Sequence, residues 1–252
     1  MIDGHCHLDG KIGDCAEAMH TLHEEAVSAG MKNVVLLNIP ELGFENREVI
    51  DRAKGYDGFF YSFPSVNPFA ASVDEEMKEL KTSGATGLKL HPRLHGYHIE
   101  NKRCFDVLQA AGELNFPVLI DCFPDGKNLS LKNMPESFAH LAEKVPDVRI
   151  AIGHAGGHRV LDALMIAKYY KNIFLDLSYT LLYYRNSGVM KNIAYAIESL
   201  RAERIFWGSD YPDRPYRETL QLSLEEFRNM RLSPDDMGKL TEQNIKNFLG
   251  VC

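Results

Sequence analysis

Short apolar runs alternate with segments of helical periodicity along the whole sequence. Apolar runs that predict strands occupy residues 1–7, 34–37, 59–63, 87–91, 117–120, 148–152, 173–177 and 204–207. Apolar residues at helical spacing occupy residues 15–29, 72–81, 105–114, 137–144, 160–170 and 189–200, and residues 233–249 predict closing helices. Strands that alternate with helices in this way are parallel, because each helix returns the chain to the same end of the sheet.

Eight strand-helix units in 252 residues predict an α/β fold, a closed (β/α)8 TIM barrel rather than an open doubly wound sheet. Such barrels have roughly 250 residues. No low-complexity linker or run of charge divides the sequence, so we expect one domain over residues 1–252.

The composition excludes several classes of protein. Hydrophobic residues make up 45% and charged residues 25%, as in an ordinary globular protein. The net charge of -7 and the absence of a Lys/Arg-rich run argue against nucleic acid as a partner. Five cysteines without a CxxC pair argue against a disulfide framework and for a reducing compartment.

The distribution of apolar residues predicts neither a membrane span nor a secreted protein. No apolar run approaches the roughly 18 residues that a spanning helix needs, and no signal peptide is visible. Any cleaved leader would also remove His5 and His7, so we expect a cytoplasmic protein.

The first candidate motif is Asp3-Gly4-His5-Cys6-His7 at the end of the first predicted strand. Side chains two apart on a strand share one face, so His5 and His7 are expected to point together into the barrel mouth. Two neutral imidazoles at this spacing suit zinc. Asp3 has the same parity and is expected to support a histidine from behind. The alternative is a pair of exposed histidines near a frayed terminus.

Two further motifs follow predicted strands. Asp210, in Gly-Ser-Asp-Tyr-Pro, comes directly after the last strand, where barrel active sites form. His154, in Gly-His-Ala-Gly-Gly, follows the sixth strand and is a candidate general acid, base or ligand. The alternatives are a turn aspartate and a loop histidine in a Gly-rich turn.

The fourth motif, Lys89-Leu-His91-Pro-Arg93, ends the fourth predicted strand. Lys89 is expected to bind an anionic group or, when carbamylated, to bridge two metals; the alternative is a strand-end lysine in solvent. Lys89, Arg93, Arg185 and Arg214 all follow predicted strands, which suggests a small carboxylic acid as substrate unless the arginines are merely solvated.

The aromatic segment at residues 178–185 can cap the pocket, enter a subunit interface such as that of a homodimer, or simply pack; we favour packing. All four motifs fall at predicted strand ends, and this conjunction is the strongest indication of an active site.

Taken together, these motifs resemble the amidohydrolase superfamily, in its amidohydrolase-2 branch, over nearly the whole chain. The resemblance rests on DGHCH, GLKLHP, IGHAGG and FWGSDYP. It implies that His5, His7 and Asp210 are metal ligands or partners of ligands and that His154 is the strand-six histidine that orients or activates. Members include decarboxylases of aromatic and related acids and lactone hydrolases.

One position departs from that pattern. The family places a ligand histidine at the end of strand five, where this sequence has Asp121. Asp121 either replaces the histidine as a ligand, or the metal is bound weakly by His5, His7 and Asp210, or the site has lost its metal and activity. Carboxylates can ligate zinc, manganese or magnesium. The neighbouring Cys122 has the opposite parity and is expected in the core.

The sequence thus predicts a metal-dependent hydrolase of a small anionic ester, lactone or amide. One divalent ion, zinc or else manganese, is held by His5, His7, Asp121 and Asp210 and activates a water. Asp210 or His154 acts as the catalytic proton acceptor. Lys89, His91 and Arg93 are expected to bind the substrate.

Three other functions use the same kind of barrel. A non-oxidative decarboxylase of a small carboxylic acid on the same site is the alternative. A non-catalytic barrel with a degenerate metal site follows it. A DNA-end nuclease ranks low, because the chain is acidic and has Lys89 where that class needs a glutamate.

Overall fold

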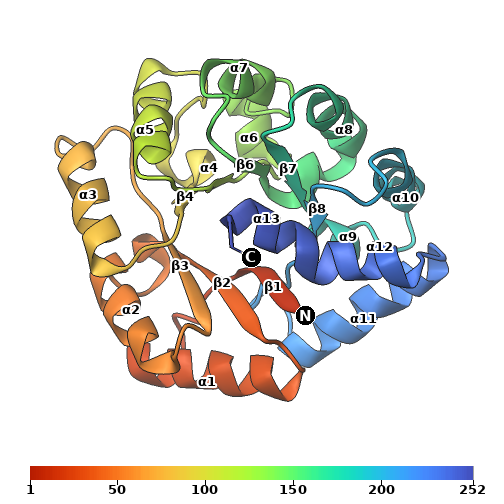
Figure 1. Ribbon diagram of the computed structural model, residues 1–252, viewed down its shortest axis with the longest axis horizontal. Coiled ribbons are helices and arrows are strands. Elements are labelled where there is room, and N and C mark those ends of the chain that lie inside the picture. The colour runs from red at the N-terminus through yellow and green to blue at the C-terminus, as the bar shows by residue number, and fades with distance from the viewer. Residues whose placement is uncertain (252) are drawn as a thin grey trace.

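The computed structural model describes residues 1–251 and is a (β/α)8 barrel of parallel strands surrounded by helices (Figure 1). The strands are β1 (Ile2–Cys6), β2 (Asn33–Asn38), β3 (Phe60–Pro64), β4 (Leu88–Leu90), β5 (Val118–Ile120), β6 (Ile150–Ile152), β7 (Ile173–Asp176) and β8 (Ile205–Phe206). Each of the eight predicted apolar runs overlaps one of these strands. The predicted barrel is therefore confirmed.

The strands form two hydrogen-bonded sets, β1-β2-β3 and β4-β5-β6-β7-β8, which meet at two seams. At one seam Ser65 bridges to Lys89 in parallel fashion. At the other, Gly4 N donates to Trp207 O over 3.1 Å, and Cys6 bridges to a residue that follows β8. These contacts bring the strands round into the ring seen in Figure 1.

Eight longer helices form the outer layer: α1 (Cys15–Ser28), α2 (Asn46–Ala53), α3 (Val73–Ser83), α5 (Lys102–Glu113), α7 (Ser137–Lys144), α8 (Val160–Tyr169), α10 (Val189–Ser199) and α11 (Tyr216–Asn229). Helix α1 begins after an N-cap residue, Asp14, whose side chain accepts hydrogen bonds from the backbone N–H groups of Ala16 and Glu17. The apolar pattern of the sequence did not predict α2 or α11. The inner face of α11 buries Thr219, Ser223 and Glu226, which weakens its apolar periodicity.

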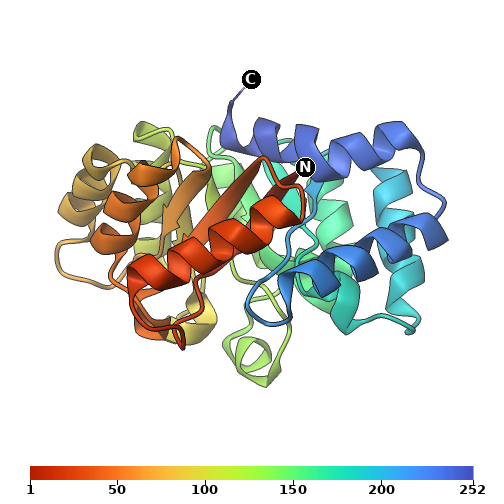
Figure 2. The ribbon, with the colours of Figure 1, turned by 90° about the horizontal axis from the view of Figure 1, so that it is seen from below.

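Shorter helical segments shape the carboxyl face and close the amino face. They are η1 (Pro40–Leu42), η2 (Lys54–Tyr56), α4 (Pro92–His95), α6 (Gly126–Leu131), η3 (Gly153–Arg159) and α9 (Thr180–Tyr183), and at the end of the chain α12 (Pro234–Gly238), η4 (Lys239–Gln243) and α13 (Asn244–Leu249). Figure 2 shows α12 and α13 lying across the end of the barrel that holds the N-terminus.

The core has an inner and an outer layer, set by the alternation of side chains along each strand. Inside the barrel, side chains from seven of the strands and from α13 form one cluster. Its members are Ile2, Val35, Leu37, Phe63, Leu119, Ala151, Phe174, Phe206, Ile245, Phe248 and Leu249. The ring of Phe248 in α13 lies 5.3 Å from that of Phe174 and 5.4 Å from that of Phe206. Because α13 plugs the amino end, the carboxyl ends of the strands are left open for a site.

Cys6, Cys15, Cys104 and Cys122 are buried free thiols, and Cys122 is in the core as expected. Cys252 lies outside the described residues. None of the helices in residues 1–251 is long and apolar enough to cross a membrane. That residues 1–252 form a single domain stays a prediction.

Candidate active site

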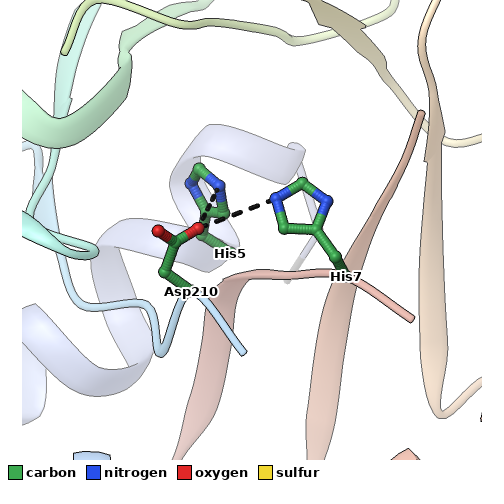
Figure 3. Close-up of side chains that lie close together, drawn as sticks. All are labelled: His5, His7 and Asp210. Atoms are coloured by element: carbon green, nitrogen blue, oxygen red, sulfur yellow. Dashed lines mark ion pairs between the residues drawn. The ribbon is translucent and has the colours of Figure 1, made fainter. Parts of the chain in front are cut away.

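Three side chains meet at the carboxyl end of the barrel, from the two strands that close the ring. Asp210 follows β8, and its backbone N–H donates to the carbonyl oxygen of His5 over 2.8 Å. Asp210 Oδ1 lies 3.1 Å from His5 Nε2 and 3.6 Å from His7 Nε2 (Figure 3). A Cβ at Gly208 would lie 2.6 Å from His5 Cβ, so only glycine allows this close approach. The two imidazoles therefore face one carboxylate oxygen.

The second nitrogen of each imidazole is held from behind. His7 Nδ1 lies 2.7 Å from the carbonyl oxygen of Leu37 in β2. His5 Nδ1 lies 2.6 Å from Oδ2 of Asp176, which ends β7. Both Nδ1 atoms face acceptors and carry the proton in the neutral ring, so both Nε2 lone pairs point towards Asp210.

This group fits a divalent cation. His5 Nε2 is buried and has no hydrogen-bond partner among residues 1–251. Ligands about 2.1 Å from a tetrahedral ion lie about 3.4 Å from one another, and the measured separations are 3.1 and 3.6 Å. Two imidazoles and a carboxylate are also a donor set that zinc accepts.

His5, His154 and Asp176 form a second cluster of potential donors, fully buried. The 2.6 Å contact between His5 Nδ1 and Asp176 Oδ2 is a direct hydrogen bond, which leaves no room for an ion between them. Ser178 completes this cluster, because its hydroxyl donates to Asp176 Oδ2 over 2.8 Å. The cluster therefore holds the His5 imidazole in place.

Sequence reasoning missed Asp176 and assigned its role to Asp3. Asp3 instead accepts from the backbone N–H groups of His5 and Ser209 and from the hydroxyl of Tyr216, and it does not hold an imidazole. A β-bulge between Asp3 and Cys6 adds one residue to β1 and reverses the parity on which the expectation depended. The sequence feature that could have identified Asp176 is a carboxylate within the otherwise apolar run at residues 173–177.

The charges of this group are strongly coupled. Burial would lower the pKa of His5, but the carboxylates of Asp176 and Asp210 outweigh it and raise the pKa to about 9. Burial lowers the pKa of His7 more than its contact with Asp210 raises it. Burial would raise the pKa of Asp210, but His5 and His7 hold it well below its ordinary value. Asp210 is therefore an anion at neutral pH.

Asp121, at the end of β5, lies outside the group that His5, His7 and Asp210 form. Asn128 donates to its Oδ2 over 2.9 Å, and Arg93 Nη2 and His154 Nε2 each lie 3.4 Å from its Oδ1. Burial would raise the pKa of Asp121, but His154, His91 and Arg93 hold it far below its ordinary value. Its expected role as a metal ligand stays a prediction.

His154 lies beside the candidate metal group, in the segment that follows β6. Its ring centre is 5.0 Å from that of His5, and its backbone has a left-handed φ of 55°. Its Nδ1 lies 3.1 Å from the carbonyl oxygen of Ser178, which accepts the Nδ1 proton. The Nε2 atom then faces Asp121, so His154 lies between His5 and Asp121.

A cavity of about 430 Å³ opens above these residues and is lined by His5, His7, Lys89, His91, Arg93, His154 and Asp210, among others. Lys89 belongs to the inner layer of the barrel, in register with Leu119, and is 1% exposed. It forms no ion pair with any residue in 1–251, and burial lowers its pKa despite nearby carboxylates. Burial likewise lowers the pKa of His91 to about 3, so this imidazole is neutral.

The family model described as Amidohydrolase matches residues 2–251. The chain belongs to the amidohydrolase family. No curated protein matches its sequence.

Solved structures with the same fold are distant in sequence. An uncharacterised TIM-barrel protein from Bordetella bronchiseptica is 22% identical, with a TM-score of 0.78 over 92% of this chain and 82% of that one. A probable 2-pyrone-4,6-dicarboxylic acid hydrolase from Acinetobacter baumannii with citric acid bound is 16% identical, with a TM-score of 0.71 over 99% and 98%. A 5-carboxyvanillate decarboxylase from Sphingomonas paucimobilis is 15% identical, with a TM-score of 0.68 over 92% and 83%.

Two arginines that the sequence suggested for substrate do not line the cavity of this amidohydrolase. Arg185 forms ion pairs with Glu225 over 2.7 Å and Glu226 over 2.6 Å on α11. Arg214 is 41% exposed beside Asp213. Both follow strands, as expected, but neither lines the pocket. The cations that line the cavity are therefore Lys11, Lys89 and Arg93.

The aromatic segment of the amidohydrolase packs beside His154. The ring of Tyr179 lies 4.9 Å from that of Phe123 and 6.0 Å from that of His154. Tyr183 stacks on Tyr179 at 5.1 Å but is 53% exposed. Tyr179 therefore packs between Phe123 and His154, in keeping with the packing role favoured for this segment.

Proposed function

We propose that this amidohydrolase is a metal-dependent hydrolase of a small anionic ester, lactone or amide. The observation that carries the proposal is the convergence of His5 Nε2, His7 Nε2 and Asp210 Oδ1, with His5 Nε2 buried and without a hydrogen-bond partner among residues 1–251. These three residues would hold one divalent ion, and zinc suits the donor set best. A bound ion supplies Lewis acidity that polarises a carbonyl oxygen and lowers the pKa of water.

Asp210 is the candidate proton acceptor. Its Oδ1 faces the two imidazoles, while its Oδ2 makes no hydrogen bond with residues 1–251. The low pKa of its carboxyl keeps it ionised at neutral pH, so Oδ2 can accept a proton from an attacking water. His154, on the other side of His5, is placed to give a proton to the leaving group.

Lys89 and Arg93 are the candidate substrate-binding residues. The Lys89 ammonium is buried, unpaired among the described residues and on the cavity wall, so a substrate carboxylate would supply its missing counter-ion. Arg93 is fixed by Asp125 over 2.7 Å and presents its guanidinium to the same cavity. The citric acid in the similar A. baumannii protein supports a small polyanionic ligand for this kind of barrel.

A decarboxylase is the second candidate, supported by the likeness to 5-carboxyvanillate decarboxylase. The position of Lys89 makes it the weaker one. An ammonium that binds a carboxylate stabilises it relative to neutral carbon dioxide, so it opposes loss of that group. Hydrolysis leaves a bound carboxylate unchanged and gains only orientation from Lys89.

Metal analysis and a substrate panel test the proposal. Elemental mass spectrometry of the purified protein should find about one zinc or manganese per chain, lost in His5→Ala and Asp210→Ala. A panel of lactones, esters and amides with and without a carboxylate should then show metal-dependent hydrolysis of the carboxylate-bearing members. Full activity in His5→Ala would overturn the scheme, and release of carbon dioxide without hydrolysis would establish the decarboxylase instead.

A further inference from the structure

A second cavity, of about 300 Å³, lies behind the loop that follows β2. It is lined by Pro40, Glu41, Glu45, Asn46, Arg47, Ser65, Asn67, Ala70, Glu76, Glu79, Leu80, Ser83 and His95. Leu42, Gly43 and Phe44 of the same loop line the active-site cavity, and no residue lines both. One loop therefore separates the catalytic cavity from a cavity that the proposed hydrolysis does not use.

The charges around this second cavity are unbalanced. Glu45, Glu76 and Glu79 form no ion pair with any residue in 1–251, and Glu41 pairs only with His95. Arg47 is the single permanent cation on the wall. Burial and the neighbouring charge of Glu79 raise the pKa of Glu76, as expected when two carboxylates share a space without a counter-ion. The cavity therefore has an excess of negative charge.

Two buried polar atoms on the same wall also lack partners among the described residues. The His95 side chain is 6% exposed, and its Nε2 lies 2.9 Å from Glu41 Oε1. When Nε2 carries the ring proton and donates it to Glu41, Nδ1 carries a lone pair, and Nδ1 has no hydrogen-bond partner among the described residues. Ser65 is 4% exposed, and its Oγ is also without a partner. The cavity therefore has more carboxylates and unpaired acceptor atoms than its one cation, Arg47, can match.

We propose that this cavity is a binding site for a small organic cation with two or more ammonium groups. Ammonium groups supply three N–H donors each and neutralise the carboxylates, while Pro40, Ala70 and Leu80 offer apolar surface for the carbon chain between them. A bare metal ion would leave this apolar surface unused. The site is separate from the metal group, so the inference does not depend on the hydrolase function.

Calorimetric titration of the full-length, metal-loaded protein with spermidine at about 150 mM salt tests the site. We expect one spermidine per chain. The double variant E76Q/E79Q should weaken binding roughly tenfold or more, because it removes two unpaired carboxylates from the wall. Glu75→Gln on the same helix α3 makes the same kind of charge change outside the cavity and should change binding by less than about twofold.

Further variants separate this cavity from other acidic places on the protein. Ser65→Ala, which removes only a hydroxyl, and His95→Phe, which keeps a ring but removes both nitrogens, should each weaken spermidine binding several-fold while thermal melting confirms folding. Asp210→Asn should bind spermidine as tightly as the unaltered protein. Loss of binding in Asp210→Asn would place the amine in the catalytic cavity and overturn the proposal. Absence of spermidine binding, or equal binding by E76Q/E79Q, would also overturn it.

Discussion

His5 Nδ1 lies 2.6 Å from Asp176 Oδ2, and this contact joins the first strand of the barrel to the seventh beneath the candidate metal group. Both side chains are at most 1% exposed. A carboxylate behind a ligand imidazole fixes the tautomer and the ring orientation and raises the basicity of the other nitrogen. The contact therefore makes a specific prediction for metal affinity.

Replacing Asp176 should weaken metal binding without touching a ligand. We expect Asp176→Ala to raise the Kd for zinc by about 10–100-fold, the usual effect of losing such a support. Asp176→Asn can still accept the Nδ1 proton but loses the charge, so its Kd should fall between those of Asp176→Ala and the unaltered protein. Competition with a chelator of known affinity measures all three. Unchanged affinity in Asp176→Ala would show that Asp176 does not act through His5.

Metal affinity should also depend on pH through His5. The pKa of His5 is raised to about 9, so in the metal-free protein this imidazole holds a proton at neutral pH, and an ion must displace it. Affinity should therefore rise about tenfold per pH unit up to about pH 9 and then level off, with about one proton released per ion at neutral pH. Calorimetry in buffers of different ionisation enthalpy measures that proton. A flat affinity from about pH 7 to 9 would contradict the prediction.

The same shift affects the stability of the metal-free protein in the opposite sense. Because the folded pKa of His5 lies above its unfolded value of about 6.5, the protonated ring stabilises the fold fully below about pH 6.5. That contribution is lost as the pH rises through about 9. Raising the pH should therefore lower the thermal stability of the metal-free protein while it strengthens metal binding.

Lys89 should be a residue that costs stability and serves binding. Lys89→Met keeps the length of the side chain and removes a buried ammonium that has no ion-pair partner among residues 1–251. We expect an unchanged or higher melting temperature, since an unpaired buried charge is destabilising. Binding of succinate, a small dicarboxylate probe, should become about tenfold weaker or more.

Lys127→Met is the control for that experiment, because Lys127 is exposed on α6 and does not line the cavity. It should leave both melting temperature and succinate binding unchanged. A large loss of stability in Lys89→Met with succinate binding retained would show that Lys89 is structural instead.

The sequence was sufficient for the barrel and for the strand ends at which the side chains gather. Runs of apolar residues and helical periodicity are local signals, and all eight predicted strands exist. His5 and His7 converge as their spacing predicted. Asp3 does not share their face, because a β-bulge between Asp3 and Cys6 shifts the alternation of side chains. Such a bulge arises from the pairing of β1 with β2 and cannot be read from the spacing of the residues alone. Contacts such as that of His5 with Asp176 join residues far apart in the sequence, and only the closure of the ring brings them together.

Asp121 stands where the family pattern has a ligand histidine, and its surroundings predict a different role from that of Asp210. Its carboxylate is already bound by Asn128 and faces Arg93 and His154. We therefore expect Asp121→Ala to keep about one metal ion per chain, while Asp210→Ala loses it.

Asp121→Ala should still impair the enzyme, because Arg93 and His154 lose the carboxylate that both of them face. Elemental analysis and succinate binding on both variants separate the two roles: Asp121→Ala should retain metal but bind the anion less tightly or in a less ordered way, whereas Asp210→Ala should lose metal. Loss of the ion in Asp121→Ala would establish it as the fourth ligand that the sequence suggested. The carboxylate would then have to turn away from Asn128, which accounts for one of its two oxygens in the present arrangement.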